Sequence, residues 1–243
     1  MKRASLVQLQ AARQAKRPVA LVTDLDRGED AVIDDGEAVA GALVLSTPVL
    51  DAVEAAIRAD RGGRLPAPNE QLFVEVFNPP LRLIVVGAVH IAQVLAPMAR
   101  LAGYAVTIVD PRRAFASDSR FPDVALRHDW PDAALRDLAP DTRTAVVTLT
   151  HDPKLDDPAL TAALDSPAFY IGALGSTRTH AKRLSRLADA GVDEAAPRRI
   201  HGPLGLPLGG RAPAEIAIAT LAQITQVLHG APPLERRAEA ATG

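Results

Sequence analysis

The sequence predicts an α/β protein in which a parallel sheet, with helices on both faces, follows a small α+β N-terminal domain. From residue 81 onward, short apolar segments alternate with stretches of helical periodicity. These segments are apolar at consecutive positions, as strands covered on both faces are. The first of them ends at Gly87, directly before a helical stretch. A glycine at this point is typical of a Rossmann-like sheet, which is the predicted fold.

Residues 1–78 show the mixed patterns of a small α+β domain. Two segments have helical periodicity, and the second has Pro48 in its first turn. The last strand candidate alternates between two sets of side chains, as strands do. Because the adjacent prolines at 79–80 cannot continue a strand ladder, we place the domain boundary there. The expected elements are helices over 3–15 and 47–60 and strands over 18–25, 40–46 and 70–77.

Residues 81–229 are expected to form the Rossmann-like domain. Residues 230–243 are polar and contain prolines, which is typical of a flexible tail. The strands are expected at 82–87, 105–110, 144–150 and 168–175. One helix is expected to end near 102 and another to begin at 131. The remaining helices are expected over 157–164, 176–189 and 213–228.

Composition excludes several functional classes. The chain has 243 residues, a net charge of −2 and no cysteine. The charge gives no reason to expect a nucleic-acid partner, and the lack of cysteine excludes disulfides, thiolate metal sites and a cysteine nucleophile. No apolar stretch is long enough to cross a membrane, and the N-terminus lacks the apolar core of a signal peptide. We therefore expect a cytoplasmic protein without a membrane partner or a metal site.

The first candidate site is the turn after the first strand of the larger domain. In dinucleotide-binding turns, the second glycine lets a pyrophosphate approach the backbone, and the third position is small. Gly87 and Ala92 suit the first and third roles, whereas Val89 puts a branched side chain at the second. A helix N-terminus still attracts an anion, so the segment is either a phosphate site or a plain Rossmann turn. The candidate residues are Gly87, Ala88, Val89, His90 and Ile91.

Asp110 ends the second strand of this domain, 23 positions after Gly87 (110 − 87). A carboxylate at about this distance binds a ribose 2′-hydroxyl in dinucleotide folds. Arg112 and Arg113 follow at a place where they would meet a phosphate. The alternative is an aspartate that caps the next turn beside two solvated arginines. Because position and chemistry agree, we favour a ligand role for Asp110 and Arg112.

Thr150, His151 and Asp152 follow the third strand, at the sheet edge where ligands bind in open α/β folds. His151 would coordinate a ligand or donate a hydrogen bond to it. Asp152 precedes Pro153 and is therefore also a common turn former. Both the ligand role and the structural role stay open for this segment.

Gly175, Ser176 and Arg178 mark the end of the fourth strand and the start of a helix. Ser176 is suited to cap this helix, whose first turn would direct amides and Arg178 toward an anion. The basic residues further along the helix are expected to form a solvated face: Lys182, Arg183 and Arg186.

A loop rich in glycine and proline precedes the last helix, and long loops of this kind are often functional. His201 and Arg211 are its polar candidates. Glu215 falls at the third position of the helix that begins at Pro213, where capping is its better assignment. The chain shows no nucleophile elbow, Walker motif or paired carboxylates, so we predict no catalytic residue.

Four segments resemble, in order over about residues 70–229, the C-terminal Rossmann domain of a known family. They are LIVVGAVHIAQVLAPMARLAGYAVTIVDPR, VVTLTHD, YIGALGSTRTHAKRLSRLADAGV and RIHGPLGLPLGGRAPAEIAIATLAQI. The family is XdhC/CoxI, the xanthine dehydrogenase accessory proteins. The resemblance implies a chaperone that binds and protects the molybdenum cofactor, supports its sulfuration and delivers it to an apo-molybdoenzyme of the xanthine dehydrogenase family. Its phosphate would then lie at Gly87–Ile91 and Gly175–Arg178.

The sequence departs from the family pattern in two places. The family turn is usually Gly-Ala-Gly-His, and here Val89 replaces the second glycine. The family's N-terminal domain often contains a cysteine, and this chain has none, so no thiolate role toward molybdenum or sulfur is available. One interpretation is a reduced paralogue. Its expected partners are a second copy of itself, a second XdhC-like protein, and a cysteine desulfurase.

Two other functions stay open. Asp110 after the strand–helix turn indicates an NAD(P)-dependent oxidoreductase or nucleotide-binding protein, with NAD(P) as the cofactor. A non-catalytic scaffold that pairs with a full-length XdhC-type protein would need no ligand at all. Titration with NADPH or NADH, together with a search for bound pterin, separates the three functions.

Overall fold

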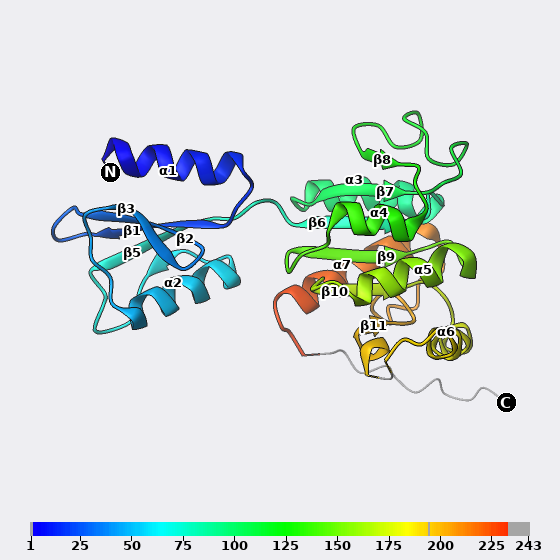
Figure 1. Cartoon of the computed structure of the whole chain (residues 1–243). Helices are drawn as coiled ribbons and strands as arrows, with labels where there is room; N and C mark the ends of the chain where they lie inside the picture. Colours follow the sequence, from blue (N-terminus) through cyan, green and yellow to red (C-terminus); the bar gives the residue numbers. More distant parts are fainter. Residues whose placement is uncertain (1, 194, 233–243) are drawn as a thin grey trace. The chain divides into compact units, whose positions relative to one another are not determined.

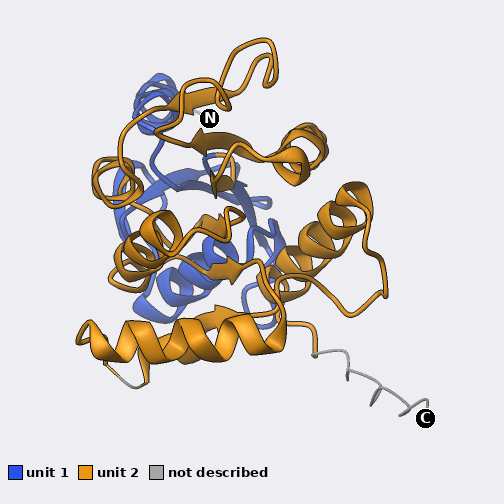
Figure 2. Cartoon of the chain, turned by 90° about the vertical axis from the view of Figure 1, so that its right-hand side faces the viewer, with its two compact units in different colours: residues 1–79 blue, residues 80–243 orange. Residues whose placement is uncertain are grey.

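The computed structural model describes residues 2–193 and 195–232. The chain divides into two compact units, Met1–Pro79 and Pro80–Gly243, each with its own sheet (Figure 2). Of the tail expected over 230–243, the part from 233 onward lies outside the described residues. Among the described residues, no helix combines the length and the apolar character that a membrane span requires.

The first unit is a five-stranded antiparallel sheet with one helix on each face (Figure 1). Alternate residues of its central strand face opposite ways, so Leu21 packs with Leu9 of the first helix and Val22 with Val53 of the second. The strand order is β3-β2-β1-β5-β4. The elements are α1 (Arg3–Gln14), β1 (Val19–Asp24), β2 (Asp30–Asp34), β3 (Glu37–Gly41), α2 (Thr47–Ala59), β4 (Gly63–Arg64) and β5 (Leu72–Phe77).

One strand of this unit lies elsewhere than predicted. The strand expected over 40–46 is β3, which covers Glu37–Gly41 and pairs with β2, a strand that the sequence pattern did not predict. The ladder ends early because the amides of Ala42 and Leu43 both donate to the carbonyl of Asp30, at 2.9 and 3.1 Å.

The second unit is a six-stranded parallel sheet in the order β11-β10-β9-β6-β7-β8. Counted from β6, this is the order 3-2-1-4-5-6 of dinucleotide-binding folds, which confirms the predicted fold class. The elements are β6 (Arg82–Val86), α3 (His90–Leu101), β7 (Ala105–Val109), β8 (Ala125–Arg127), α4 (Pro131–Leu138), β9 (Thr144–Thr148), α5 (Pro153–Leu164), β10 (Tyr170–Ala173), α6 (Thr177–Asp189), a 3₁₀ turn (Ala196–Arg199), β11 (Ile200–His201) and α7 (Pro213–Leu228).

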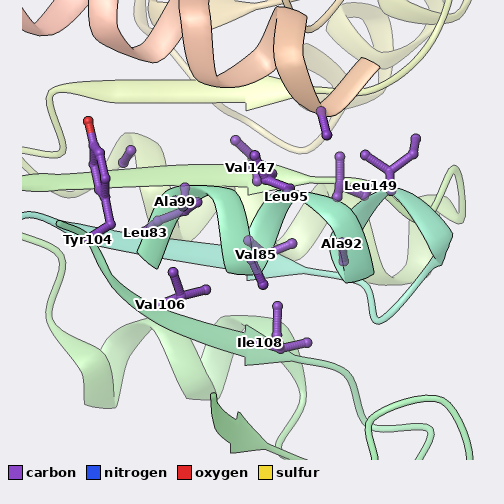
Figure 3. Packing of buried hydrophobic residues seen from close by; sticks show 14 of the residues in the cluster. Leu83, Val85, Ala92, Leu95, Ala99, Tyr104, Val106, Ile108, Val147 and Leu149 are labelled. Carbon is purple, nitrogen blue, oxygen red and sulfur yellow. The ribbon is translucent and has the colours of Figure 1, made fainter. Parts of the chain in front are cut away.

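Helices cover both faces of this sheet. Val85 of β6 packs in a cluster with Leu95 of α3, and this cluster also includes residues of α7. Figure 3 shows the α3 side chains lying over those of the central strands. The preceding strand residue, Ile84, faces the other way and packs in a cluster with Leu160 of α5 and residues of α4 and α6. The sheet is therefore buried on both faces, as its continuous apolar strands predict.

Two details of this unit differ from the prediction. The short strands β8 and β11 at the two sheet edges were missed. Helix α5 begins at Pro153 rather than at 157, because Asp152 is its N-cap and accepts a hydrogen bond from the Lys154 amide at 3.0 Å. Proline at the first helical position suits this start.

Candidate functional site

The carboxyl ends of four neighbouring strands carry the candidate residues. In the order β10-β9-β6-β7, these strands lead into the segments at 174–178, 149–152, 87–91 and 110–112. The chain leaves β6 for a helix on one face and β9 for a helix on the other. The ends of β6 and β9 therefore flank the topological switch point, where open α/β sheets bind ligands.

Gly87 and Thr150 meet at this switch point. The φ angle of Gly87 is 109°, in a region that side chains rarely adopt. A Cβ added to Gly87 would lie 2.6 Å from the Thr150 Cγ2 atom, and the Gly87 amide donates to the Val109 carbonyl at 2.9 Å. Both the backbone angle and the close packing therefore require glycine here.

Val89 is the N-cap of α3 and has an extended backbone and a half-buried side chain. It offers no capping oxygen, so the free amides at this helix start have no side-chain partner from position 89. His90 is exposed, and its Nδ1 atom lies 3.2 Å from the Gln93 Oε1 atom. Ala88 and Ile91 are buried, and the Ala88 amide and carbonyl already have partners in Asp110 and Arg120.

Asp110 is buried, with 0% of its surface exposed. Its Oδ2 atom accepts from the Ala88 amide at 2.9 Å and from Arg112 Nη2 at 2.8 Å, and its Oδ1 atom accepts from the Arg112 amide and Nε, both at 2.9 Å. Burial acts to raise the pKa of Asp110, but these hydrogen bonds outweigh it and hold the pKa below its usual value. This carboxylate joins two turns, and no part of it is exposed to bind a ribose.

The loop after β7 reaches back to the glycine turn. Arg120 donates to the Ala88 carbonyl at 2.9 Å and to the Gln93 Oε1 atom at 3.0 Å. Arg112 lies over the ring of Phe115, with 4.6 Å between the guanidinium carbon and the ring centroid. Sequence patterns did not point to Arg120 or Phe115, because no motif marks a loop residue that folds back on an earlier turn.

The segment after β9 has an unusual backbone. His151 is exposed and has a φ angle of 61°, in the left-handed region that is uncommon for residues other than glycine. Such conformations cluster at functional sites. Thr150 donates its hydroxyl to Asp156 Oδ1 at 2.6 Å and accepts from the Asp152 amide at 3.1 Å. The structural role that stayed open for Asp152 is present, because its side chain caps α5; His151 is the free side chain of the segment.

The start of α6 lies at the end of β10. Gly175 has a φ angle of 143°, and an added Cβ would lie 2.9 Å from the Thr179 Cγ2 atom. Ser176 accepts from the Thr179 amide at 3.2 Å, which confirms its predicted capping role. Ser176 and Arg178 are exposed. A second helix N-terminus with an exposed cation therefore lies at this sheet edge.

The solvated face expected on α6 is wrong for Arg183, which is only 1% exposed. Its Nη2 atom donates to the Leu174 carbonyl at 2.8 Å and lies 3.8 Å from Asp156 Oδ2. Burial raises the pKa of Asp156 and lowers that of Arg183. Arg186, one turn further on, pairs with Asp157 at 2.6 Å and is partly exposed.

The loop before α7 places its two polar candidates differently. His201 is half-buried and stacks on the ring of Tyr170, with 4.7 Å between centroids, and burial lowers its pKa. Arg211 contributes its backbone: its amide and that of Ala212 donate to Glu215 Oε2, at 2.8 and 2.9 Å. The predicted capping role of Glu215 is confirmed. These hydrogen bonds hold its pKa below the usual value.

The parallel sheet in the order 3-2-1-4-5-6, with a glycine turn after its first strand and the starts of α3, α5 and α6 at its carboxyl edge, defines a Rossmann-type domain. Residues 83–224 match the XdhC Rossmann domain. The chain therefore belongs to the XdhC family.

Three curated relatives show what this chain is similar to. The molybdenum cofactor insertion chaperone PaoD of Escherichia coli (strain K12) is 33% identical over 62% of this chain and 41% of its own length. A probable xanthine dehydrogenase subunit from Bacillus subtilis (strain 168) is 31% identical over 64% of this chain and 45% of its own length. The uncharacterized protein YqeB of E. coli (strain K12) is 31% identical over 73% of this chain and 32% of its own length. The chain thus spans less than half the length of each relative.

A solved structure extends the similarity to nearly the whole chain. The crystal structure of a xanthine dehydrogenase from Bacillus halodurans aligns with 93% of this chain and 66% of that chain, at a TM-score of 0.73 and 26% identity. The alignment thus includes part of the antiparallel first unit as well as the Rossmann unit.

Proposed function

We propose that this chain binds the molybdenum cofactor as cargo at the carboxyl edge of its parallel sheet and delivers it to an apo-enzyme of the xanthine dehydrogenase class. Membership of the XdhC family and similarity to PaoD, a molybdenum cofactor insertion chaperone, support this role. The observation that carries the choice of site is the contact of the Gly87 turn with Thr150 at the switch point, beside the left-handed His151.

The residues at this edge suit a pterin that carries a phosphate. Helices α3 and α6 both begin here, and helix N-termini attract anions. Arg178 is exposed at the second of these starts, and His151 and His90 offer exposed polar side chains near the switch point. We assign the direct contacts to the backbone of residues 89–91 and to these three side chains, because the Gly87 and Ala88 amides already donate to Val109 and Asp110. Asp110, Thr150 and Asp152 then support the site from behind.

A binding measurement tests this function. The purified protein is denatured and oxidised, and the supernatant is examined for pterin fluorescence; protein freed of ligand is titrated with cofactor released from a purified molybdoenzyme. We expect a bound pterin. Failure to find or bind a pterin, together with tight binding and turnover of NADPH, would overturn the chaperone function and favour the oxidoreductase. Binding of neither, with a stable complex to a full-length XdhC-type protein, would favour the scaffold.

Glycine at position 87 provides a matched test of the site itself. Gly87→Ala brings a Cβ within 2.6 Å of Thr150 Cγ2, so we expect cofactor affinity to fall by about tenfold or more. The control is Gly103→Ala, because Gly103 also has a positive φ, 90°, but an added Cβ meets no atom within 4 Å. Equal affinities for the two variants would place the ligand away from the Gly87 turn.

The partners follow from the same proposal. The client is an apo-molybdoenzyme, and a second copy of this chain, an XdhC-like protein or a cysteine desulfurase would act beside it. Light scattering of the pure protein and co-purification with each tagged candidate test these contacts. A monomer that co-purifies with no client enzyme would contradict this part of the proposal.

A further inference from the structure

Asp156 and Arg183 form a buried ion pair behind the candidate site. Asp156 lies in the first turn of α5 and Arg183 on α6, and each is 1% exposed. Their closest charged atoms are 3.8 Å apart. Within the described part of the chain, Asp156 Oδ2 and Arg183 Nε and Nη1 are buried and have no hydrogen-bond partner. The pair is therefore desolvated but incompletely satisfied.

Stability does not explain such a pair. Taking two charges out of water costs free energy, which their attraction offsets only with good geometry and with all donors and acceptors satisfied. Here the separation is long and three polar atoms are unpartnered. An apolar pair of similar size would serve the packing of α5 against α6 as well. The two charged groups call for another role.

The hydrogen bonds of the other carboxylate oxygen of Asp156, Oδ1, indicate that role. Asp156 Oδ1 accepts from the Thr150 hydroxyl at 2.6 Å and from the Thr150 amide at 3.4 Å. The same hydroxyl accepts from the Asp152 amide at 3.1 Å, and the Thr150 methyl group fills the space beside Gly87. Asp156 Oδ1 therefore holds Thr150 directly and, through the Thr150 hydroxyl, the Asp152 amide on the other side of the left-handed His151.

Arg183 supplies the support on the far side of Asp156. Its Nη2 atom is fixed by the Leu174 carbonyl, directly after β10. A guanidinium held there attracts the carboxylate of Asp156 without competing for Oδ1. The contacts run from the end of β10 through Arg183, Asp156 and Thr150 to the turn after β6. These contacts therefore link the ends of β10, β9 and β6 around the switch point.

We propose that Asp156 and Arg183 are positioning residues that hold Thr150 and His151 in the geometry required for ligand binding at the switch point. This inference rests on the proposed function for its ligand, but its structural half is testable without one. Residues that support a ligand-binding group matter because their packing and hydrogen bonds fix the orientation of that group.

Two double variants separate positioning from packing. Asp156→Leu with Arg183→Met removes both charges and the acceptor for Thr150. Asp156→Asn with Arg183→Met also removes both charges but keeps an amide oxygen that accepts from Thr150. Hydrogen exchange of the peptide covering 149–153 is measured in the ligand-free protein, and affinity is then measured with cofactor released from a purified molybdoenzyme.

We expect the leucine variant to exchange faster over 149–153 and to bind about tenfold more weakly, the size seen when residues supporting a metal ligand are lost. The asparagine variant should lie between the parent and the leucine variant in both measurements, because it keeps the acceptor for Thr150 but loses the Arg183 guanidinium that holds the carboxylate. Equal behaviour of the two variants in exchange would overturn the positioning role. If the parent binds no cofactor, the proposed function fails, and the exchange result still decides the positioning role.

A neighbouring ion pair gives the matched control. Asp157 and Arg186 join the same two helices at 2.6 Å, one residue further along α5. Asp157→Asn with Arg186→Met should leave exchange over 149–153 unchanged; faster exchange there would show a general effect of loosening α5 from α6 and would overturn the proposal. Should the leucine variant not fold, Thr150→Val replaces it, because the valine removes the hydroxyl link to Asp156 and Asp152. Unchanged exchange in that variant would equally count against the positioning role.

Discussion

The second unit contains two buried aspartates that face arginines, and the two pairs differ in how well they are satisfied. Asp110 accepts four hydrogen bonds of 2.8–2.9 Å from Ala88 and Arg112. Asp156 lies 3.8 Å from Arg183, with polar atoms of both residues unpartnered. Arg112 comes two residues after Asp110, so one turn brings both amide and guanidinium to the carboxylate. Asp156 and Arg183 come from different helices, whose packing sets their separation.

The difference shows in the acidity of the two carboxyl groups. Both are desolvated, which acts to raise the pKa. At Asp110 the hydrogen bonds from Arg112 and two backbone amides outweigh burial, and the pKa is lowered. At Asp156 the Thr150 hydrogen bonds and the Arg183 charge do not outweigh burial, and the pKa is raised. The same two residue types therefore stabilise the fold where Asp110 meets Arg112, whereas the burial of Asp156 beside Arg183 costs free energy.

The largest expected effect is the loss of the satisfied carboxylate. Asp110→Ala leaves the Ala88 amide and the Arg112 guanidinium without their acceptor, so we expect the free energy of unfolding to fall by about 3 kcal/mol. Urea denaturation measures it. A loss below about 1 kcal/mol would show that water replaces Asp110, and that the two pairs do not differ as described.

Replacing both members of a pair by apolar residues should have a smaller effect on stability, and this effect should differ between the two pairs. Asp156→Leu with Arg183→Met should change the free energy of unfolding by less than about 1 kcal/mol, because the loss of the Thr150 hydrogen bonds is offset by the removal of a poorly satisfied buried pair. Asp110→Leu with Arg112→Met should lower it by about 2 kcal/mol, because the Ala88 amide also loses its acceptor. Similar losses in parallel urea titrations would remove the distinction between the pairs.

The dependence of stability on pH should have opposite signs for the two residues. The folded-state pKa of Asp110 is below the ordinary 3.8, so its contribution is present above that pH and is lost as the pH falls through the folded pKa. The folded-state pKa of Asp156 is above 3.8, so the native state gains relative stability as the pH falls toward 3.8. On acidification, the parent's advantage over Asp110→Asn should shrink, whereas its stability relative to Asp156→Asn should rise. Denaturation curves from neutral to acidic pH check both signs.

The smallest effect is expected at a pair that water reaches. Arg127 and Asp137 are 2.7 Å apart, closer than Asp156 and Arg183, but Asp137 is 66% exposed. Asp137→Ala should cost less than about 0.5 kcal/mol in the same urea assay, because exposed ion pairs are screened. A cost near that of Asp110→Ala would mean that proximity, rather than burial and satisfaction, distinguishes the pairs.

The sequence predicted the long elements of the fold and missed the short ones. Hydrophobicity alone predicted the strands of the second sheet that consist almost entirely of apolar residues. An example is Arg82–Val86, in which every residue after Arg82 is apolar. Strands β8 and β11 have three and two residues, too few for a periodicity to show. The hairpin of β2 and β3 had a signal in Asp35-Gly36, whose φ angles of 52° and 75° suit a tight hairpin turn. Charged Asp30 and Asp34 at the ends of β2 made this strand look like a loop.

For the candidate site, the sequence located positions but not partners. Strand ends placed Gly87, Asp110 and Thr150 at one sheet edge because parallel strands share an edge. The interpretation of Asp110 as a ligand did not foresee that Arg112 and an amide from an earlier turn occupy it. Arg183 lies 27 positions (183 − 156) from Asp156 on another helix, and no local pattern reveals a counter-charge at that distance.

The contact between the Gly87 turn and Thr150 couples the two positions in evolution. Alanine at 87 collides with the γ-methyl group of Thr150, whereas serine at 150 would keep the hydroxyl that Asp156 binds and remove that methyl. A lineage therefore loses least when serine appears first and alanine second, with the backbone strain at 87 and a 3.3 Å approach to the amide nitrogen of residue 150 left to tolerate. One methyl group sets the order in which these two substitutions are accessible.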